Sequence, residues 1–536
     1  MMNRRYFSFL AFLAITGCAG TSAQFGTIGS TSGEPESGIA AAQATATNGV
    51  DAAAATITPE DVYQRIALLA SDEMAGRDTP SPELDRAADY IAGEFERLGL
   101  QPAGDDGSYI QRYALQKRAL IADDVRVAAT GPGGNASLVF GSDFFVLPGA
   151  AERVRADAVY AGRAGSAETD EALRGNIAVY ELPGSPQDPT FNQAIARASQ
   201  AAEESGAVAK IFVLDAAFPA PLIRQTAEHF SLSTGLQVGE TKGLPAYFVS
   251  ADAGARLAAA ADVEPAQLQQ RARAGATPIP ATTVELAAPM RIEDDHRVPN
   301  VVAVLPGSDP ELRDTYVIFS AHFDHVGIGR PDASGDSIYN GADDNASGTS
   351  ALLEVAEAFA ALEEAPARSL VFLAVSGEEK GLLGSQYYSD NPTLPIEQMV
   401  ANINVDMIGR NAPDSIVVIG QEYSSLGPLV REVAAERPEL GLTVAEDIWP
   451  EQRFFFRSDH YNFARKEIPA LFFFAGVHED YHRPSDHVEK IDTDKTARVA
   501  RLIFYTAYEI ASREDEPQWT EEGLREIRAM TRGGRR

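Results

Sequence analysis

Hydrophobic side chains recur at helical spacing in the first folded part of the chain. Residues 58–71 and 84–100 each place apolar side chains on one face of a 3.6-residue period. Thr58 followed by Pro59 is a typical start of a helix, and Gly99 is a typical stop. The pattern therefore predicts two amphipathic helices here.

From about residue 298 the apolar runs become continuous and alternate with amphipathic stretches. The runs expected to form strands are 298–307, 315–327, 369–379, 399–409, 414–420 and 468–477. The expected helices between them include 347–364 and 427–438. Because such strands are apolar on both faces, we expect an α/β domain, with a mixed, mostly parallel sheet sandwiched by helices.

The segment 123–287 has a different character. Short β-type runs surround an alanine-rich helical stretch at 194–208, and the segment contains a single histidine, His229. We expect a smaller, β-rich α/β domain that is inserted into the larger one and carries no catalytic cluster. The predicted order is 58–122 and 288–515 for the two parts of the large domain, 123–287 for the insert, and 516–536 for a C-terminal tail.

The N-terminus has the pattern of an export signal. Arg4 and Arg5 precede a short apolar run, and the small residues before Cys18 resemble a lipoprotein cleavage site. We expect a signal peptide over 1–17, lipidation of Cys18, and a flexible tether over 18–57. The protein would then sit in a bacterial cell envelope, facing the periplasm or the exterior; the alternative is a soluble secreted protein with an incidental Cys18.

The composition of the chain excludes several classes of binding partner and of metal site. The formal net charge of −32 argues against nucleic-acid partners and against anionic membrane surfaces, because phosphates would be repelled. A membrane contact is expected through the lipid anchor alone. Cys18 is the one cysteine of the chain, which excludes an intrachain disulfide and a cysteine-based zinc site. The pattern specifies no oligomeric state.

Chemically active side chains follow the predicted strands of the large domain. These residues are His322, Asp324, Asp343, Asp344, Glu378, Glu379, Asp406, Tyr481 and His482. Six of the eight histidines lie between His322 and His487. Because the carboxyl ends of parallel strands meet at one edge of a sheet, we expect these side chains to gather there.

Two histidines and three carboxylates without cysteine suit a pair of zinc-like ions. Two such ions, bridged by a carboxylate, can polarise a carbonyl group and activate a water molecule. A further carboxylate beside the metals, but not bound to them, is needed to move the proton of that water. The adjacent Glu378 and Glu379 can supply one ligand and one base.

Five short motifs in this order resemble the M28 family of zinc metallopeptidases, of the aminopeptidase type. The motifs are SAHFDHVG, GADDNASG, GEEKGLLGS, NVDMIGR and YHRPSD. The resemblance implies the fold of zinc-dependent exopeptidases and two Zn²⁺ per chain, with Co²⁺ or Mn²⁺ suited to similar ligands. It implies that His322, Asp344 and Asp406 hold one metal and that Asp344, Glu379 and His482 hold the other, so that Asp344 bridges.

The same resemblance assigns the remaining roles. Glu378 would act as general acid and base, and Tyr481 would donate its hydroxyl to the developing oxyanion. Asp324 and Asp486 would orient the histidine ligands. Two residues of RSDHYNF, Arg457 and Asp459, are candidates for substrate contact or for support of the site. Structural or surface roles are expected for the other histidines of this region, His325, His460, His478 and His487.

The insert resembles a protease-associated (PA) domain through RGNIAVYE and AAEESGAVAKIFVLD. Such a domain would shape the entrance to the active site; the alternative is a spacer. The expected activity is removal of N-terminal residues from peptides that have a free N-terminus. Glutaminyl cyclisation, a carboxypeptidase-like activity, a catalytically silent binding module and a structural envelope lipoprotein remain alternatives. The pattern does not indicate a side-chain preference.

Overall fold

The chain divides into two compact units in the computed structural model, which describes residues 49–186, 188–216, 218–232, 236–239, 243–272 and 275–534. The first unit contains residues up to Tyr113 and from Arg297 onward, and the second contains Ala114–His296. The predicted signal peptide, Cys18 and most of the predicted tether lie outside the described residues. No described helix is long and apolar enough to cross a membrane.

The unit boundaries differ from the expected 123 and 287. Two long strands, β2 (Ile110–Leu120) and β12 (Met290–Leu305), each run from one unit into the other. A change of domain inside a continuous strand leaves no break in the hydrophobic pattern, so the sequence does not mark it.

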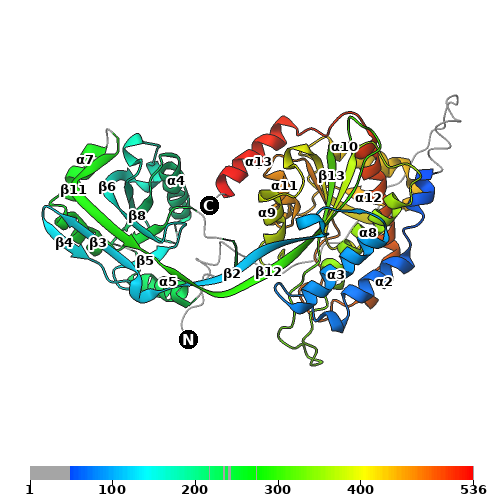
Figure 1. The fold of residues 1–536 in the computed structure, drawn as a ribbon, viewed down its shortest axis with the longest axis horizontal. Coiled ribbons are helices and arrows are strands. Elements are labelled where there is room, and N and C mark those ends of the chain that lie inside the picture. Colours follow the sequence, from blue (N-terminus) through cyan, green and yellow to red (C-terminus); the bar gives the residue numbers. More distant parts are fainter. Residues whose placement is uncertain are drawn as a thin grey trace. The chain divides into compact units, whose positions relative to one another are not determined.

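The first unit is built on a mixed sheet with a parallel centre (Figure 1). Its strands are, in spatial order, β17 (Thr443–Ala445), β16 (Ser415–Ile419), β18 (Ala470–Phe474), β15 (Met399–Val405), β13 (Tyr316–His322), β14 (Ser369–Val375) and β12, which also pairs with β1 (Gln101–Pro102). Strands β18, β15, β13 and β14 are parallel, whereas β12 and β16 run antiparallel to their neighbours β14 and β18. The predicted mixed, mostly parallel sheet is confirmed.

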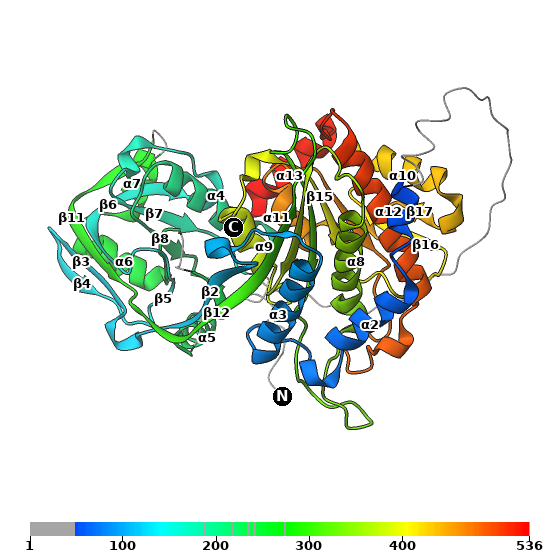
Figure 2. The same ribbon diagram turned by 45° about the vertical axis from the view of Figure 1, so that its right-hand side comes forward.

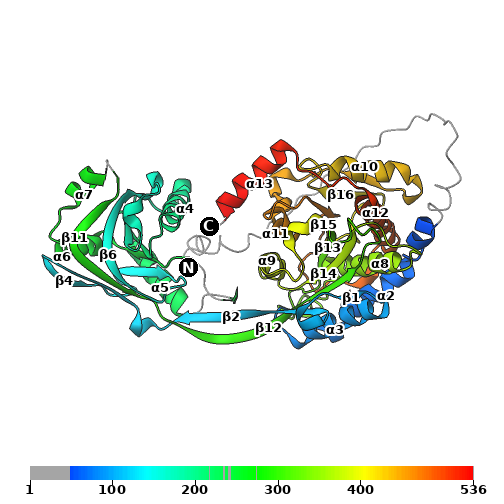
Figure 3. The same cartoon turned by 45° about the horizontal axis from the view of Figure 1, so that its top comes forward.

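Helices cover both faces of this sheet (Figure 3). One side carries α2 (Pro59–Leu69), α3 (Pro82–Arg97), α8 (Gly348–Ala360) and α12 (Thr493–Ser512), and the other carries α9 (Leu383–Asp390) and α11 (His460–Ala464). Helix α10 (Leu426–Glu436) packs near β17 and β18. The helices expected at 58–71 and 84–100 are confirmed as α2 and α3. The predicted start of α2 is also confirmed, because Thr58 Oγ1 accepts a hydrogen bond from the Asp61 N–H at 3.1 Å and caps the helix.

The predicted tether and the predicted C-terminal tail both contain helical residues. Residues 49–54 of the predicted tether are helical, and Val50, Ala54 and Ile57 are buried. The predicted tail contains α13 (Glu521–Gly534), on which Ile527 is buried. In both segments a few apolar side chains pack against the unit, too few to stand out from a small-residue or polar composition.

Among its described residues, the second unit has its own eight-stranded sheet and four α-helices (Figure 2). The strands are, in spatial order, β4 (Gly134–Ser137), β3 (Arg126–Gly131), β11 (Thr277–Ala287), β6 (Arg153–Arg163), β7 (Ile177–Leu182), β8 (Ala209–Leu214), β10 (Ala246–Val249) and β5 (Phe144–Leu147). The helices are α4 (Pro189–Glu204), α5 (Ala220–Leu232), α6 (Ala251–Ala260) and α7 (Pro265–Arg271). Strand β9 (Leu236–Val238) pairs with β2. The predicted β-rich α/β character is confirmed.

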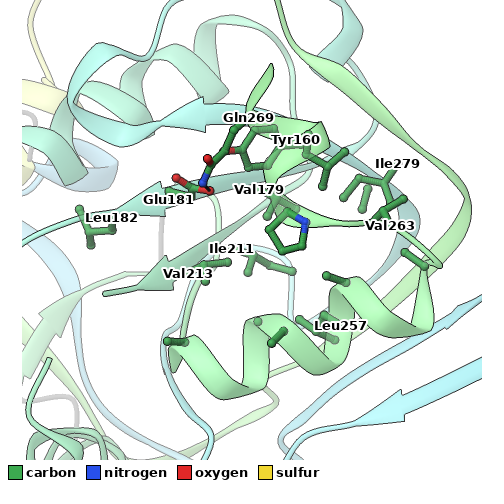
Figure 4. Close-up of a pocket in the computed structure, with 18 of the residues that line it drawn as sticks. Tyr160, Val179, Glu181, Leu182, Ile211, Val213, Leu257, Val263, Gln269 and Ile279 are labelled. Atoms are coloured by element: carbon green, nitrogen blue, oxygen red, sulfur yellow. Dashed lines mark hydrogen bonds between the residues drawn. The ribbon is translucent and has the colours of Figure 1, made fainter. Parts of the chain in front are cut away.

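A cavity of about 380 Å³ lies between α6, α7 and this second sheet (Figure 4). Its walls are mostly aliphatic, and Glu181 and Gln269 lie at one end, where Gln269 Nε2 donates to Glu181 Oε1 at 2.6 Å. Helix α6 presents Gly254 and Ala258 to the cavity. Small side chains at these positions leave the space between helix and sheet unfilled.

Replacing Ala258 by leucine is expected to raise the free energy of unfolding by about 1 kcal/mol, because the added methylene groups fill apolar space. Urea unfolding of the full chain measures the effect. Ala259→Leu is the matched control, since Ala259 is exposed. A leucine at 258 that stabilises no more than the leucine at 259 would show that the cavity cannot be filled from α6.

Candidate metal centre and active site

The five predicted metal ligands lie together at the carboxyl edge of the first sheet. His322 ends β13, Glu379 follows β14, Asp406 follows β15, and His482 lies in the loop after β18. Asp344 lies in the irregular segment that leads into α8. Four strands and one helix entrance therefore each contribute one side chain, as the parallel topology requires.

Asp344 faces both histidines with different oxygens. His322 Nε2 lies 3.4 Å from Asp344 Oδ1 and 3.3 Å from Asp406 Oδ1. His482 Nε2 lies 3.1 Å from Asp344 Oδ2 and 3.1 Å from Glu379 Oε2. The side chains thus form two groups that share one carboxylate, which is the arrangement expected for two adjacent cations.

Two glycines allow the chain to bring these residues together. Gly377, just before Glu378, has φ +71°, and a Cβ there would lie 2.8 Å from Tyr113 Oη. Gly341 has φ +59°, and a Cβ there would lie 2.3 Å from the Asp344 carbonyl oxygen. Both positions combine left-handed backbone with close packing, so glycine is required at each.

The ligand atoms are buried and lack hydrogen bonds. Within the described parts of the chain, His322 Nε2, His482 Nε2, Asp344 Oδ2, Asp406 Oδ1 and Glu379 Oε1 have no hydrogen-bond partner. Buried polar atoms without partners are rare and unfavourable. The ligand residues fall into two groups, and within each group one ligand atom from every residue lies within 4.8 Å of the others. Nitrogen and carboxylate oxygen donors at such spacing fit zinc-like divalent cations.

Charge in the site also favours a cation. The Asp344 and Glu379 carboxylates outweigh the effect of burial on His482 and raise its pKa to about 10. Burial and the charge of Glu379 raise the pKa of Asp344. Both shifts favour protonation of these side chains, and a divalent cation that displaced the protons would relieve the same excess of negative charge.

Glu378 lies beside this cluster and outside both groups of ligand atoms. Burial raises the pKa of the Glu378 carboxyl well above its usual range; His322 opposes the shift, and the carboxylates of Glu379 and Asp459 add to it. Its backbone N–H donates to Asp324 Oδ1 at 3.2 Å. The side chain is still partly exposed. A carboxyl group that is accessible and has a raised pKa can both accept and donate a proton during a reaction.

Asp324 contacts His322 as the sequence predicts. His322 Nδ1 lies 3.2 Å from the Asp324 carbonyl oxygen and 3.7 Å from Asp324 Oδ1. Thr79 Oγ1 donates to Asp324 Oδ2 at 2.8 Å and fixes the carboxylate. The backbone carbonyl, rather than the carboxylate, is the nearer partner of the imidazole.

Asp486 supports a different ligand from the one expected. Its Oδ2 accepts the backbone N–H groups of Asp343 and Asp344, at 3.0 and 3.2 Å. Asp486 therefore fixes the main chain of Asp344, which bears the shared carboxylate. Backbone donors carry no sequence signature, so spacing from His482 pointed to the wrong partner.

The segment RSDHYNF contributes Ser458, which the sequence did not single out. Ser458 Oγ donates to Asp406 Oδ2 at 2.9 Å and accepts from Asn404 Nδ2 at 2.9 Å. Arg457 is exposed, with its guanidinium carbon 4.8 Å from the centre of the Phe454 ring. Asp459 is fully buried, and burial raises its pKa to about 7. Because Asp459 is buried, a role in supporting the site fits it better than direct contact with a substrate.

Tyr481 stacks on a ligand. The rings of Tyr481 and His482 have centroids 3.9 Å apart at an angle of 25°. Burial, together with the charges of Asp344 and Glu379, raises the pKa of Tyr481, so the phenol stays protonated and can donate a hydrogen bond. Its role toward an oxyanion stays a prediction.

Arg77 is a second residue that sequence reasoning missed. It is fully buried, and its guanidinium donates to the carbonyl oxygens of Phe323 (2.8 Å), Asn340 (2.8 Å), Gly341 (3.0 Å) and Leu69. Burial lowers its pKa to about 10, against the attraction of Asp324 and Asp344. One cation thus joins the segment after His322 to the segment before Asp344.

Replacing Arg77 with methionine is expected to destabilise the protein by about 3–5 kcal/mol, since several buried carbonyl groups lose their donor at once. Arg77→Lys is expected to recover little, because one ammonium group cannot reproduce a planar fork. Urea unfolding gives the values, and Arg86→Met, at a half-exposed position, is the control. A loss of stability no larger than that of the control would show that the hydrogen bonds of Arg77 do not stabilise the fold.

The four remaining histidines of the region lie in different environments. His460 is fully buried and stacks on Phe472, with centroids 4.7 Å apart, and His487 is partly exposed. His478 Nε2 lies 3.2 Å from Asp343 Oδ2. His325 differs from the expectation of a structural or surface role, because its Nδ1 lies 2.9 Å from Glu379 Oε1, within one of the two groups of ligand atoms.

Known proteins match this part of the chain. Residues 300–507 match the family described as Peptidase family M28. A probable leucine aminopeptidase of Arthroderma benhamiae is 27% identical over 258 residues, which are 46% of this chain and 67% of that protein. A probable zinc metalloprotease of Pyrenophora teres f. teres is 37% identical over 114 residues, 21% of this chain and 23% of that protein.

Among solved structures, the aminopeptidase from Aneurinibacillus sp. strain AM-1 is 21% identical, and the match covers 86% of this chain and 96% of that one. Its TM-score of 0.44 is too low for a comparison of the sites. The likeness to this family therefore rests on the sequence match over residues 300–507, which contain all five predicted ligands. Through this region, the chain is similar to peptidase family M28.

Proposed function

We propose that the protein is a metal-dependent exopeptidase, an aminopeptidase that removes N-terminal residues with the help of two zinc ions. The observation that carries the proposal is the pair of buried ligand groups that share Asp344, with Glu378 beside them and outside both. The names of the relatives, leucine aminopeptidase and zinc metalloprotease, support the same activity and metal.

Each residue has a defined part in this proposal. His322, Asp344 and Asp406 would hold one ion, and Asp344, Glu379 and His482 the other. When bound, such ions supply Lewis acidity, which polarises the scissile carbonyl group and lowers the pKa of water.

The chain itself moves the proton and binds the charge that develops. Glu378 accepts the proton of the attacking water and then donates it to the nitrogen of the departing amine. The hydroxyl of Tyr481 donates a hydrogen bond to the oxyanion that forms from the scissile carbonyl group. Asp324, Asp486 and Ser458 hold the ligands in place through the contacts described above.

A panel of substrates tests the function. Leucine p-nitroanilide should be hydrolysed, its N-acetylated twin should not, and a chelator should abolish the activity until zinc is restored.

Preferential cyclisation of an N-terminal glutaminyl peptide would identify a glutaminyl cyclase, and release of C-terminal residues a carboxypeptidase. Stoichiometric zinc without hydrolysis would identify a binding module, and no metal at all a structural lipoprotein. Replacement by Co²⁺ or Mn²⁺ identifies the metals that sustain activity.

We propose in addition that the chain is anchored in a bacterial envelope through a lipid on Cys18. The apolar run before a lone cysteine supports this proposal. The wild-type protein should partition into the detergent phase, and Cys18→Ala should partition into the aqueous phase. Equal partition of both would contradict the anchor.

The second unit is proposed to be a PA-like insert that shapes access of peptides to the site. Its insertion between Tyr113 and Arg297 and its own α/β core support this proposal. A leucyl peptide series of increasing length, compared with the anilide, is expected to show a fall in kcat/KM beyond a few residues. A flat series would favour a spacer.

A further inference from the structure

His325 lies inside the site although it is not among the five expected ligands. Its side chain is fully buried, with Nδ1 2.9 Å from Glu379 Oε1 and 3.6 Å from Asp344 Oδ2. The ring meets the His482 ring edge-on, with centroids 5.5 Å apart at 75°. The two imidazoles thus approach the same two carboxylates from different directions.

The Nδ1 atom of His325 behaves like the ligating nitrogens of His322 and His482. All three lie close to carboxylate oxygens, and all three lack a hydrogen-bond partner among the described residues. Proximity without an aligned hydrogen bond leaves each nitrogen free to bind a cation between the oxygens. Two ligands about 2.0–2.1 Å from one tetrahedral zinc lie roughly 3.3 Å apart, and the contacts of His325 straddle this value.

The fold holds the His325 ring in this position. Its backbone N–H donates to the Arg77 carbonyl oxygen at 3.2 Å. The ring packs against Gly341, where a Cβ would lie 2.6 Å from His325 Cγ. Its Nε2 is also buried and has no hydrogen-bond partner in the described part of the chain. No hydrogen bond from the protein therefore accounts for burying this imidazole.

We propose that His325 is a fourth protein ligand to the metal held by Asp344, Glu379 and His482. The proposal rests on the proposed function, because it requires the metal pair. It makes the two sites unequal, with four protein ligands on one and three on the other. The four-ligand site is closed by the protein and fills first, whereas the site of His322, Asp344 and Asp406 keeps an open position.

Metal titration of the full-length protein tests this inference. Zinc affinities are measured by competition with a chromophoric chelator, and Co²⁺ is added stepwise while its visible absorption is recorded. In the wild type we expect two unequal sites, and the first Co²⁺ equivalent should show the strong absorption of four-coordinate cobalt. In His325→Ala the tighter site should weaken at least about 100-fold, and the first-equivalent absorption should change.

His325→Gln separates a ligand from a hydrogen-bond donor. Glutamine can donate a hydrogen bond to Glu379 but is a poor zinc ligand, so the affinity of this variant should resemble that of His325→Ala. Wild-type affinity in His325→Gln would overturn the inference and leave a donor role. His296→Ala, at a partly exposed histidine of the second unit, is the control and should titrate like the wild type.

The outcomes distinguish this inference from the proposed function. Circular dichroism of the metal-free proteins shows that each variant is folded before titration. If the wild type binds two zinc ions and His325→Ala binds them equally well, the fourth ligand is wrong and the metal pair stands. If the wild type binds no zinc, the metal pair itself is wrong, and the inference falls with it.

Discussion

Glu378→Gln should lower kcat for leucine p-nitroanilide at least about 10²-fold while the protein keeps its fold and its metal content. The substitution removes the group that carries the proton but leaves the side chain nearly unchanged in shape. Because Glu378 lies outside both groups of ligand atoms, the zinc content of the dialysed variant should match that of the wild type. KM should change little, since the lost interaction is made in the transition state.

The matched control is Glu479→Gln. Glu479 is exposed in the loop that carries Tyr481 and His482, so the same chemical change there should leave kcat unchanged. Wild-type turnover by Glu378→Gln would show that Glu378 is not the general base. Glu378→Gln without zinc would instead show that Glu378 is a ligand.

Asp344→Ala should abolish binding of both metal ions, the largest effect expected of a single substitution on metal content. Asp344 presents one oxygen to His322 and the other to His482, so its removal takes a ligand from each group. Asp406→Ala, which alters one group, should lose one ion and retain the other. Elemental analysis of dialysed protein gives the number of zinc ions per chain.

Asp314→Ala serves as the control for this series, because Asp314 is exposed and precedes β13, whose opposite end carries His322. It should keep the wild-type zinc content. Two zinc ions retained by Asp344→Ala would contradict the shared carboxylate, and loss of both ions from Asp406→Ala would show that the two groups do not fill independently.

The sequence predicts the ligand cluster because the topology of the sheet determines where most of the ligands lie. His322, Glu379 and Asp406 each follow a buried parallel strand, and parallel strands end at one edge of the sheet. The order of the five motifs adds the roles. Neither source depends on details of side-chain packing, which is why both agree with the positions seen in the structure.

The supporting residues could not be predicted in the same way. Arg77 acts on backbone carbonyl groups that lie up to 264 positions further along the chain, and Asp486 acts on backbone N–H groups. Main-chain partners have no residue identity, so no sequence pattern reports them. His325 could have been suspected from its place three residues after His322, but its direction relative to Glu379 depends on the packing of Gly341.

Anomalous diffraction from zinc-loaded crystals, measured at the zinc edge, shows directly whether two metal ions share Asp344. Two peaks are expected, about 3.5–4 Å apart, on either side of the Asp344 carboxylate. One should lie among His322, Asp344 and Asp406, and the other among Asp344, Glu379 and His482. A single peak, or peaks that do not contact Asp344, would contradict the two-metal site.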